Sequence, residues 1–433
     1  MTPLDISASP PSQAGNGPES VLVRPPEEWL SAQAIRSSAS AVMARAQANE
    51  SRHFTWHPER MAVATAYVVA LMKERYPDGL VPLYSIWRHV ASGDQNRWNQ
   101  LAAEHGLSPE TTRLEHARAQ IDFAVVAALM AGGQAPLWHY SDTSSGQHLP
   151  QPPGMAVAVL RWMGAGAFSS LSTHPVQVDA QGLAMVDGAS MNLAFQVGPN
   201  NPLPGIAMRV SALHQLGLAL EQHAQLFSLP EAPGVLRPGH LVDTLFRLAP
   251  TGRIKAASLL SMLLHAFGEV WHGPNELNGV NLGDCWRHEA APGGWVAFHQ
   301  QAQWLAYSLI EPLQTAGLTV TDLDVLTGLP DLRNGGLLLD LGILQARDRA
   351  FHTQRWTLDA EAVVEWRALS VAILDHLAES VRGELGLTVE SFPVGRLMEA
   401  GTWAAGCKIA LAKRPAGSPP VQIDSDGAAF FPL

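Results

Sequence analysis

From residue 27 onward, apolar residues recur at the three-to-four-residue spacing of an α-helix, and this periodicity is the strongest structural signal in the chain. Segments with the alternating pattern of a β-strand are few. The sequence therefore predicts a mainly α-helical protein. The spacing indicates amphipathic or buried helices over residues 61–76, 109–130, 206–227, 241–248, 255–267, 297–313 and 359–381.

The predicted helix at 109–130 has start and stop signals at its ends. Ser108 precedes it as an N-cap candidate, and Glu110 places an acidic group in its first turn. Gly132 and Gly133 follow its last turn, where glycine commonly ends a helix. We expect the helix to fill the interval between these signals.

Proline content divides the 433-residue chain. Residues 1–26 are rich in proline, with serine, glycine and asparagine between, and we expect a disordered or extended arm there. Residues 27–433 are expected to form a single, mostly helical catalytic domain. Prolines also punctuate residues 134–205, which could be a loop-rich elaboration or a boundary, and 176–186 could form a small β-hairpin.

The composition excludes several classes of protein. The formal net charge is −11, which argues against sequence-independent nucleic-acid binding. Hydrophobic residues make up 47% and charged residues 15%, against a usual charged share of about 25%, which indicates a large core. We find no signal peptide, no run of membrane-spanning length, and only two cysteines, Cys285 and Cys407, so we expect a cytoplasmic protein that binds no membrane. No Cys/His/Asp cluster has ligand spacing and no nucleotide-binding loop appears, so we expect neither a metal nor an organic cofactor.

The segment 326–344, LTGLPDLRNGGLLLDLGIL, is the first candidate for chemistry. Asp331 and Arg333 flank one leucine, and two glycines follow. An arginine beside a carboxylate favours its ionised form, and an ionised carboxylate can stabilise an oxocarbenium-like transition state. The structural alternative is a carboxylate at a helix start with a local ion pair.

One tripeptide occurs twice, as Trp87-Arg88-His89 and as Trp286-Arg287-His288. Tryptophan can stack on a planar group, while arginine and histidine can donate to an anion. We expect the two copies to come together on a phosphate, with Asp284 orienting His288 or pairing with Arg287. The structural alternative is core tryptophans with capping cations.

Two helical segments add polar candidates. In 298–308, the spacing places Gln300, Trp304, Tyr307 and Ser308 near one helix face, where they could bind a urea-like or sugar-like ligand. In the long C-terminal helix, Glu365 lies beside an apolar stripe, where an acid usually needs a partner. We expect a buried network between Glu365 and Arg367, or direct catalysis by the acid.

Nine motifs follow one another between about residue 50 and the C-terminus: WHPERM (56–61), YSIWRH (84–89), FQVGPNNPL (195–203), LGDCWRH (282–288), QWLAYSLIEPL (303–313), LTGLPDLRNGGLLLDLGIL (326–344), VEWRAL (364–369), GTWAAG (401–406) and IDSDG (423–427). In this order they resemble the uracil catabolism family. This resemblance implies a place in the route that converts uracil to a nucleotide, opens its ring and releases urea.

A shorter stretch is similar to the queuosine salvage family, whose members hydrolyse an N-glycosidic bond. The similar parts are Asp331-Leu332-Arg333, the run at 338–344 and Glu365-Trp366-Arg367. This resemblance implies an all-helical fold like that of helical DNA glycosylases, with Asp331 as the catalytic carboxylate. The chain departs from that family's motif by having Leu332 in place of tyrosine.

Both resemblances converge on hydrolysis of a ring-opened uridylate, a ribosylurea phosphate, to urea and ribose phosphate. We expect Asp331, Arg333 and Glu365 in catalysis, with Gln303, Tyr307 or His288 donating to the leaving urea. The alternatives are a non-catalytic partner or scaffold that contacts the ring-opening enzyme, and a ureido amidohydrolase, for which the sequence offers no evident nucleophile. The residues expected to bind substrate are Trp87, Arg88, His89, Trp286, Arg287, His288, Gln303, Trp304, Tyr307 and Arg367.

Overall fold

The computed structural model describes residues 25–92, 95–271 and 273–424, and these residues are mainly α-helical, as the sequence predicts. The helices are α1 Ala32–Gln47, α2 Met61–Arg75, α3 Trp87–Val90, α4 Arg97–Glu104, α5 Arg113–Met130, α6 Pro153–Gly164, α7 Ala180–Ala184, α8 Gly188–Ala194, α9 Ile206–Gln222, α10 Ala224–Phe227, α11 Leu241–Leu248, α12 Ala256–Ala266, α13 Gln300–Ala316, α14 Asn334–Asp340, α15 Glu361–Leu385, α16 Val394–Leu397 and α17 Trp403–Lys413. A π-helical turn, Met398–Thr402, joins α16 to α17.

The strands are short and pair two by two. The antiparallel pairs are β1–β12, β2–β3, β4–β5, β7–β8 and β9–β10, whereas β6–β11 and β13–β14 are parallel. The strands are β1 Phe54–Trp56, β2 Ala91–Ser92, β3 Gln95–Asn96, β4 His139–Asp142, β5 Gln147–Pro150, β6 Arg253–Lys255, β7 Glu276–Leu277, β8 Val280–Asn281, β9 Cys285–Arg287, β10 Trp295–Ala297, β11 Thr319–Thr321, β12 Leu344–Ala346, β13 Arg355–Trp356 and β14 Gln422–Ile423.

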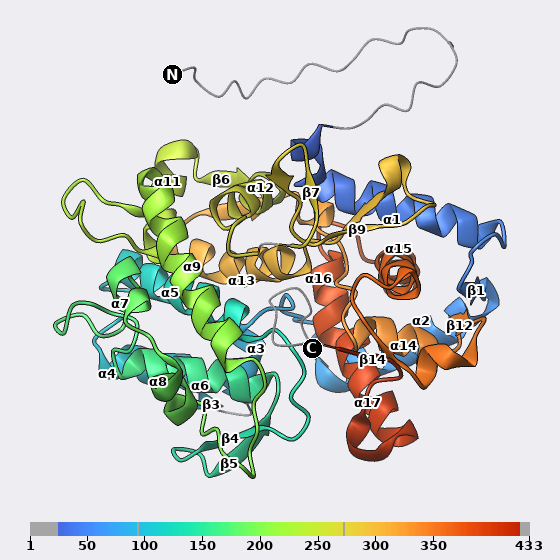
Figure 1. Cartoon of the computed structure of the whole chain (residues 1–433), viewed down its shortest axis with the longest axis horizontal. Coiled ribbons are helices and arrows are strands. Elements are labelled where there is room, and N and C mark those ends of the chain that lie inside the picture. Colours follow the sequence, from blue (N-terminus) through green and yellow to red (C-terminus); the bar gives the residue numbers. More distant parts are fainter. Residues whose placement is uncertain (1–24, 93–94, 272, 425–433) are drawn as a thin grey trace, which may run out of the picture.

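Two long buried helices organise the core. Helix α13 runs beside α5, and α15 packs against α1, α2 and α14 (Figure 1). Nearly every residue of α13 is buried, so its polar side chains need partners inside the protein. It begins after His299, which has the left-handed φ of 43°, and ends at Gly317 with φ of 104°. A left-handed glycine at this position is a common helix stop.

The region 134–205 packs into the same core but differs from the sequence-based expectation. The predicted hairpin at 176–186 is wrong, because Asp179 accepts a hydrogen bond from the Gly182 backbone at 2.8 Å and so caps the start of α7. The hairpin of this region is instead β4–β5, with His139 opposite Pro150. Helix α6 packs on α5, which attaches the region to the central helices.

One predicted helix boundary also shifts. Helix α5 starts at Arg113, because Ser108 caps a separate turn by accepting from the backbone of Glu110 and Thr111. The predicted arm at 1–26 lies outside the described residues except at its end, where Pro26 begins the short 3₁₀ turn Pro26–Trp29. In the described part of the chain, the helices are too short or too polar to cross a bilayer.

Candidate functional site

Asp331 is a buried carboxylate at the start of α14. Only 2% of the residue is exposed, and its side chain accepts hydrogen bonds from the backbone of Arg333 at 2.8 Å and of Asn334 at 2.7 Å. The Asn334 side chain donates a third bond to Oδ2, at 2.7 Å. A carboxylate has about four acceptor positions, so one position of Oδ2 has no donor among the described residues.

Burial changes the acidity of this group. Removal from water raises the pKa of Asp331 to about 7, although the bonds from Asn334 and Arg333 oppose the rise. A carboxylate that only caps a helix is ordinarily held ionised by the backbone N–H groups. A pKa near neutrality is instead the value that suits acid–base or charge-stabilising work.

Close packing fixes the segment that holds Asp331. The Thr402 hydroxyl donates to Oδ1 of Asn334 at 2.6 Å, so the Asn334 amide nitrogen is turned toward Asp331. Helix α17 approaches the same segment at Gly406, where an added Cβ would lie 2.2 Å from the Arg333 carbonyl oxygen. The GTWAAG motif therefore positions the Asp331 segment in two ways: the Thr402 hydroxyl binds Asn334, and Gly406 lets α17 approach the Arg333 backbone.

Asp331 lines a narrow pocket walled by aromatic rings. Its other lining residues are Tyr84, His89, Ala131, Pro152, Gln300, Trp304 and Leu329. The ring centroids of Tyr84 and Trp304 are 6.4 Å apart, and that of His89 lies 5.9 Å from those of both Trp304 and Trp403. Burial lowers the pKa of His89 to about 4, so this ring is neutral at neutral pH.

Four buried nitrogen atoms at this pocket lack partners among the described residues. They are Nε2 of His89, Nε2 of Gln300, Nε1 of Trp304 and Nε1 of Trp403, which packs on Tyr84 and His89. Buried polar atoms are nearly always hydrogen-bonded, so a cluster of exceptions around one carboxylate calls for a ligand or water. Burial also raises the pKa of Tyr84 well above its usual value, so its phenol stays neutral.

Gln300 is held by a charged network behind the pocket. Arg367 donates to Oε1 of Gln300 at 3.2 Å, and the Gln300 backbone donates to Asp284 at 3.1 Å. Arg367 and Asp284 form a buried bidentate pair at 2.9 and 2.8 Å, and the guanidinium also lies 4.0 Å over the ring of Phe298. Asp284 therefore pairs with Arg367 and with the Trp286 indole, not with Arg287 or His288 as expected.

Glu365 belongs to a separate cluster, so the expected Glu365–Arg367 pairing is wrong. Glu365 accepts from the Ser51 hydroxyl, from the His53 backbone at 3.2 Å and from His288 at 3.3 Å. Burial alone would raise the pKa of Glu365, but these bonds lower it below its usual value. Nδ1 of His288 accepts from the Ala290 backbone, so Nε2 is the nitrogen that donates to Glu365.

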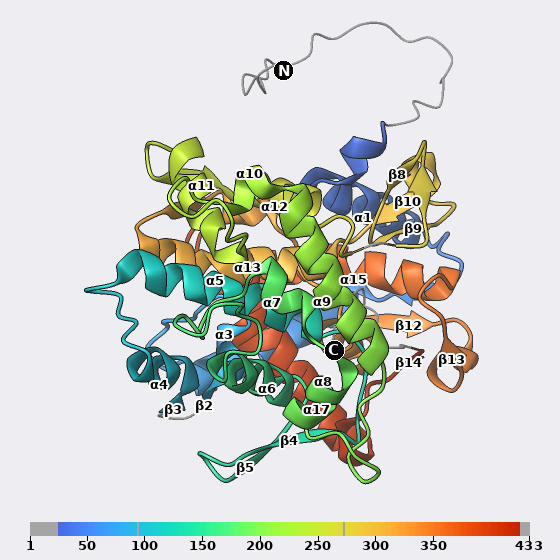
Figure 2. The same cartoon turned by 60° about the vertical axis from the view of Figure 1, so that its left-hand side comes forward.

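The two Trp-Arg-His copies do not come together. Helix α3 and strand β9 lie apart in both views (Figures 1 and 2). Nη2 of Arg88 donates to both carboxylate oxygens of Glu311, at 2.6 and 2.7 Å, whereas Arg287 stacks 3.6 Å over the ring of Trp295. Of the six residues, only His89 lines the Asp331 pocket.

Other predicted donors already have partners. The Tyr307 hydroxyl donates to the Thr327 carbonyl at 3.2 Å. The Gln303 amide nitrogen donates to the Phe298 carbonyl and the Thr327 hydroxyl, and its oxygen accepts from the Thr327 backbone. Arg333 donates through Nη1 to the carbonyl of Gly417 at 2.7 Å. On the predicted helix face, Gln300 and Trp304 thus line the pocket, while Tyr307 is tied to Thr327.

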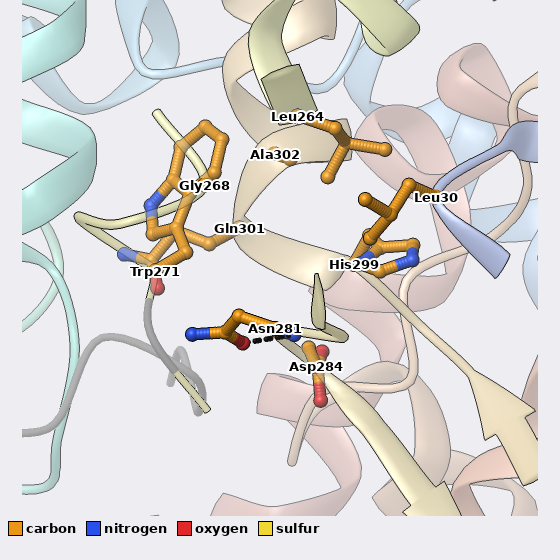
Figure 3. A pocket seen from close by; sticks show the side chains of 10 residues that line it. Leu30, Leu264, Gly268, Trp271, Asn281, Asp284, His299, Gln301 and Ala302 are labelled. Carbon is orange, nitrogen blue, oxygen red and sulfur yellow. Dashed lines mark hydrogen bonds between the residues drawn. The ribbon is translucent and has the colours of Figure 1, made fainter. Parts of the chain in front are cut away.

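A second pocket lies on another side of the first turn of α13 (Figure 3). Leu30, Trp271, Asp284, His299 and Gln301 are among its lining residues. The Asp284 carboxylate has all four acceptor positions filled, by Trp286, Arg367 twice and the Gln300 backbone. This pocket is therefore a weaker candidate for chemistry than the one at Asp331.

The cysteines do not supply a nucleophile. Burial raises the pKa of the Cys285 thiol well above its usual value. Its sulfur lies 3.7 Å from Nε2 of His299, but that nitrogen donates to the Trp29 carbonyl at 2.8 Å and so cannot take the thiol proton. Burial likewise raises the pKa of Cys407, to about 11.

Sequence reasoning missed several residues of this site. Tyr84 and Trp403 occur in the quoted motifs YSIWRH and GTWAAG, but their rings meet only in the folded chain. Asn334 follows Arg333 directly and was a detectable amide beside the predicted acid. The described residues include no group of three His, Cys, Asp or Glu side chains arranged to hold a metal ion.

The fold and this pocket define a mainly α-helical protein with one buried carboxylate surrounded by neutral donors and aromatic rings. The chain belongs to the family described as "Protein of unknown function (DUF1688)", whose model matches residues 28–430. It is 31% identical over 411 residues to Protein urg3 of Schizosaccharomyces pombe, an alignment that covers 93% of this chain and 98% of the relative. It is 29% identical over 443 residues to Uracil catabolism protein 4 of Lachancea kluyveri, covering 94% and 99% of the two chains.

Proposed function

We propose that this protein acts in uracil catabolism and that it hydrolyses an N-glycosidic bond at Asp331. The first part is supported by the name of the Lachancea kluyveri relative, with which it aligns over nearly the whole of both chains. The single observation that supports the chemistry is that, among the described residues, Asp331 keeps one acceptor position open in a pocket of buried nitrogen atoms that have no partner.

Cleavage of a glycosidic bond builds positive charge on the sugar ring. An ionised Asp331 beside the anomeric carbon would stabilise that charge, and the same carboxylate can take a proton from the attacking water. The faces of Tyr84 and Trp304 add attraction for a cationic ring through their π-electrons. The neutral state of His89 avoids repulsion between this ring and the developing cation.

The substrate that we propose is a ring-opened uridylate, in which ribose bears a ureido group. The described residues that line the Asp331 pocket include neither arginine nor lysine, so we assign the uncharged sugar and ureido parts of the substrate, and not its phosphate, to this pocket. A 5′-phosphate would have to extend beyond the lining residues. The assay therefore includes ribosylurea with and without its 5′-phosphate. We propose the cytoplasm as the place of the reaction.

The test measures urea and reducing sugar separately after incubation with each compound. Both products should appear in equal amounts, since one bond cleavage releases both. Asp331→Asn should lower kcat by about 10³-fold, the scale seen when one positioned electrostatic group is removed. The melting temperature of this variant is measured alongside, because its new amide would face the same backbone donors as the carboxylate that it replaces.

Each alternative function has its own outcome. An amidohydrolase acting on the ureido group would release ammonia with no reducing sugar. A scaffold for the ring-opening enzyme would release neither product but would co-purify with that enzyme. Urea release at the wild-type rate from well-folded Asp331→Asn would refute the assignment of this residue.

A further inference from the structure

We infer that Gln300 and Trp304 bind the carbonyl oxygen of the departing urea, and that Asp284 and Arg367 are positioning residues that hold the Gln300 amide for this task. The inference rests on the proposed N-glycosidase function. It assigns the leaving-group donors, which the sequence placed on Gln303, Tyr307 or His288.

The orientation of the Gln300 amide follows from its partners. An arginine has only donors, so the group of Gln300 that faces Arg367 at 3.2 Å has to be the carbonyl oxygen. The amide nitrogen is then directed away from the arginine, and it is the atom that has no partner among the described residues. Gln300 lines the pocket of Asp331 and is fully buried, so a ligand or a water in that pocket can accept from these N–H groups.

The guanidinium of Arg367 is held in place by two other contacts. Both of its terminal nitrogens are bound by Asp284, and its plane lies over the ring of Phe298. Asp284 also accepts from the Gln300 backbone, so the same carboxylate fixes both the main chain of Gln300 and the cation at its side chain. The buried charge pair is thus a rigid support for one neutral amide.

Trp304 supplies the second donor. It follows Gln300 by four residues on α13, so the two side chains share a helix face. Its indole N–H is also buried without a partner among the described residues, and its ring packs beside Tyr84 in the same pocket. A carbonyl oxygen has two lone pairs and accepts two hydrogen bonds, which matches two N–H donors.

These donors would lower the cost of expelling urea. The C1′–N bond breaks and its electron pair leaves with the urea nitrogen, where resonance moves part of the charge to the urea oxygen. Water forms the new C1′–O bond and gives its proton to Asp331, from which the proton passes to the urea nitrogen. Fixed donors at the urea oxygen stabilise the transition state in the manner of an oxyanion hole.

A leaving-group comparison separates this role from a structural one. Ribosylurea needs stabilisation of its leaving group, whereas 4-nitrophenyl β-D-ribofuranoside releases a stable anion that has no carbonyl. Trp304→Phe keeps an aromatic side chain but removes the indole N–H, and Gln300→Glu keeps an oxygen facing Arg367 but removes the amide nitrogen. We expect each to lower kcat on ribosylurea by about 10²-fold, the lower end of the loss seen for one oxyanion donor, and on the nitrophenyl compound by a few-fold at most.

Arg367→Lys tests the positioning role, since lysine keeps the charge but not the bidentate geometry. It should reproduce the selective loss on ribosylurea, with kcat falling more than KM rises, and should add little further loss in the Gln300→Glu background. Product inhibition by urea gives a second measurement, which does not depend on whether the protein hydrolyses the nitrophenyl compound. The inhibition constant of urea should rise about tenfold in each single variant, which corresponds to the loss of one hydrogen bond of about 1.4 kcal/mol.

The outcomes distinguish this inference from the proposed function. If wild-type protein releases no sugar from either compound, the N-glycosidase proposal itself fails. If it hydrolyses ribosylurea but the variants lose equally on both substrates, or urea inhibits every variant as it inhibits the wild type, then Gln300 and Trp304 do not bind the leaving group.

Discussion

The indole N–H of Trp87 donates to the carbonyl oxygen of Ser308 at 2.7 Å, in the middle of α13. Within the helix this carbonyl has no donor, because the residue four positions later is Pro312, which lacks a backbone N–H. The Ser308 hydroxyl accepts in turn from the Ile86 backbone at 3.0 Å. The proline thus creates an acceptor that anchors α3 on α13 and places His89 beside Trp304.

Loss of this anchor should destabilise the protein. Trp87→Phe leaves the Ser308 carbonyl buried without a donor, at an expected cost of about 1–3 kcal/mol in the free energy of unfolding. Pro312→Ala returns a backbone N–H at the correct position, so the cost of Trp87→Phe should be smaller in that background. Urea denaturation of the four proteins of this double-mutant cycle measures the coupling. Equal losses in both backgrounds would mean that the cost is only lost indole packing.

Gly406 offers a test of how the Asp331 segment is held. Gly406→Ala would place a methyl group 2.2 Å from the Arg333 carbonyl, a contact that the backbone cannot relieve without moving. We expect a destabilisation of about 1–3 kcal/mol, typical of overpacking, and lower turnover by the protein that stays folded.

Gly383 is the matched control. It lies in α15, and apart from the adjoining backbone of that helix no described atom lies within 4 Å of an added Cβ. Gly383→Ala should therefore stabilise the helix by about 0.5–1 kcal/mol. Denaturation curves and kcat are measured for both variants. If Gly406→Ala behaves like Gly383→Ala, α17 does not hold the Asp331 segment in place.

The sequence predicted the local parts of this site and failed on the distant ones. Asp331 lies next to its backbone donors in the chain, and Gln300 and Trp304 are four residues apart on one helix, so periodicity places them on one face. Arg367 pairs with Asp284, 83 residues away, and no local pattern encodes that choice. The expected Glu365–Arg367 pair fails for a geometric reason, because helical residues two apart do not face each other.

Glu365 should contribute stability that disappears in acid. The bonds from His288, Ser51 and His53 lower its pKa in the folded state, so the folded protein holds the ionised form more strongly than the unfolded chain does. This stability is fully present above the unfolded pKa of about 4.3 and is lost as pH falls through the lower folded pKa.

Glu365→Gln removes this dependence, since its amide does not ionise. The difference in unfolding free energy between wild type and variant should therefore shrink as pH falls below about 4.3, the unfolded pKa. Chemical denaturation at several pH values measures it. A constant difference across this range would show that Glu365 has the same pKa in both states.

The contribution of Asp331 to stability should depend on pH in the opposite direction to that of Glu365. Its folded pKa is about 7, above the unfolded value, so the folded state binds the extra proton across the interval between them. Stability must fall as pH rises through that interval, by at most about 1.4 kcal/mol per pH unit, and level off above pH 7. Asp331→Asn lacks the ionisable group, so its stability relative to wild type should rise over the same range.

The same titration should appear in the activity. The proposed reaction needs the ionised carboxylate, so kcat/KM on ribosylurea should rise with pH to a plateau, with an apparent pKa near 7 for the free enzyme. Asp122 is the matched control, because burial also raises its pKa to about 7, but it pairs with Arg237 and accepts from the Gly239 backbone elsewhere in the fold. Asp122→Asn should change the pH dependence of stability and leave the midpoint of the activity profile in place. An activity midpoint near pH 4 in the wild type, or a midpoint that moves with Asp122→Asn, would exclude Asp331 as the titrating group.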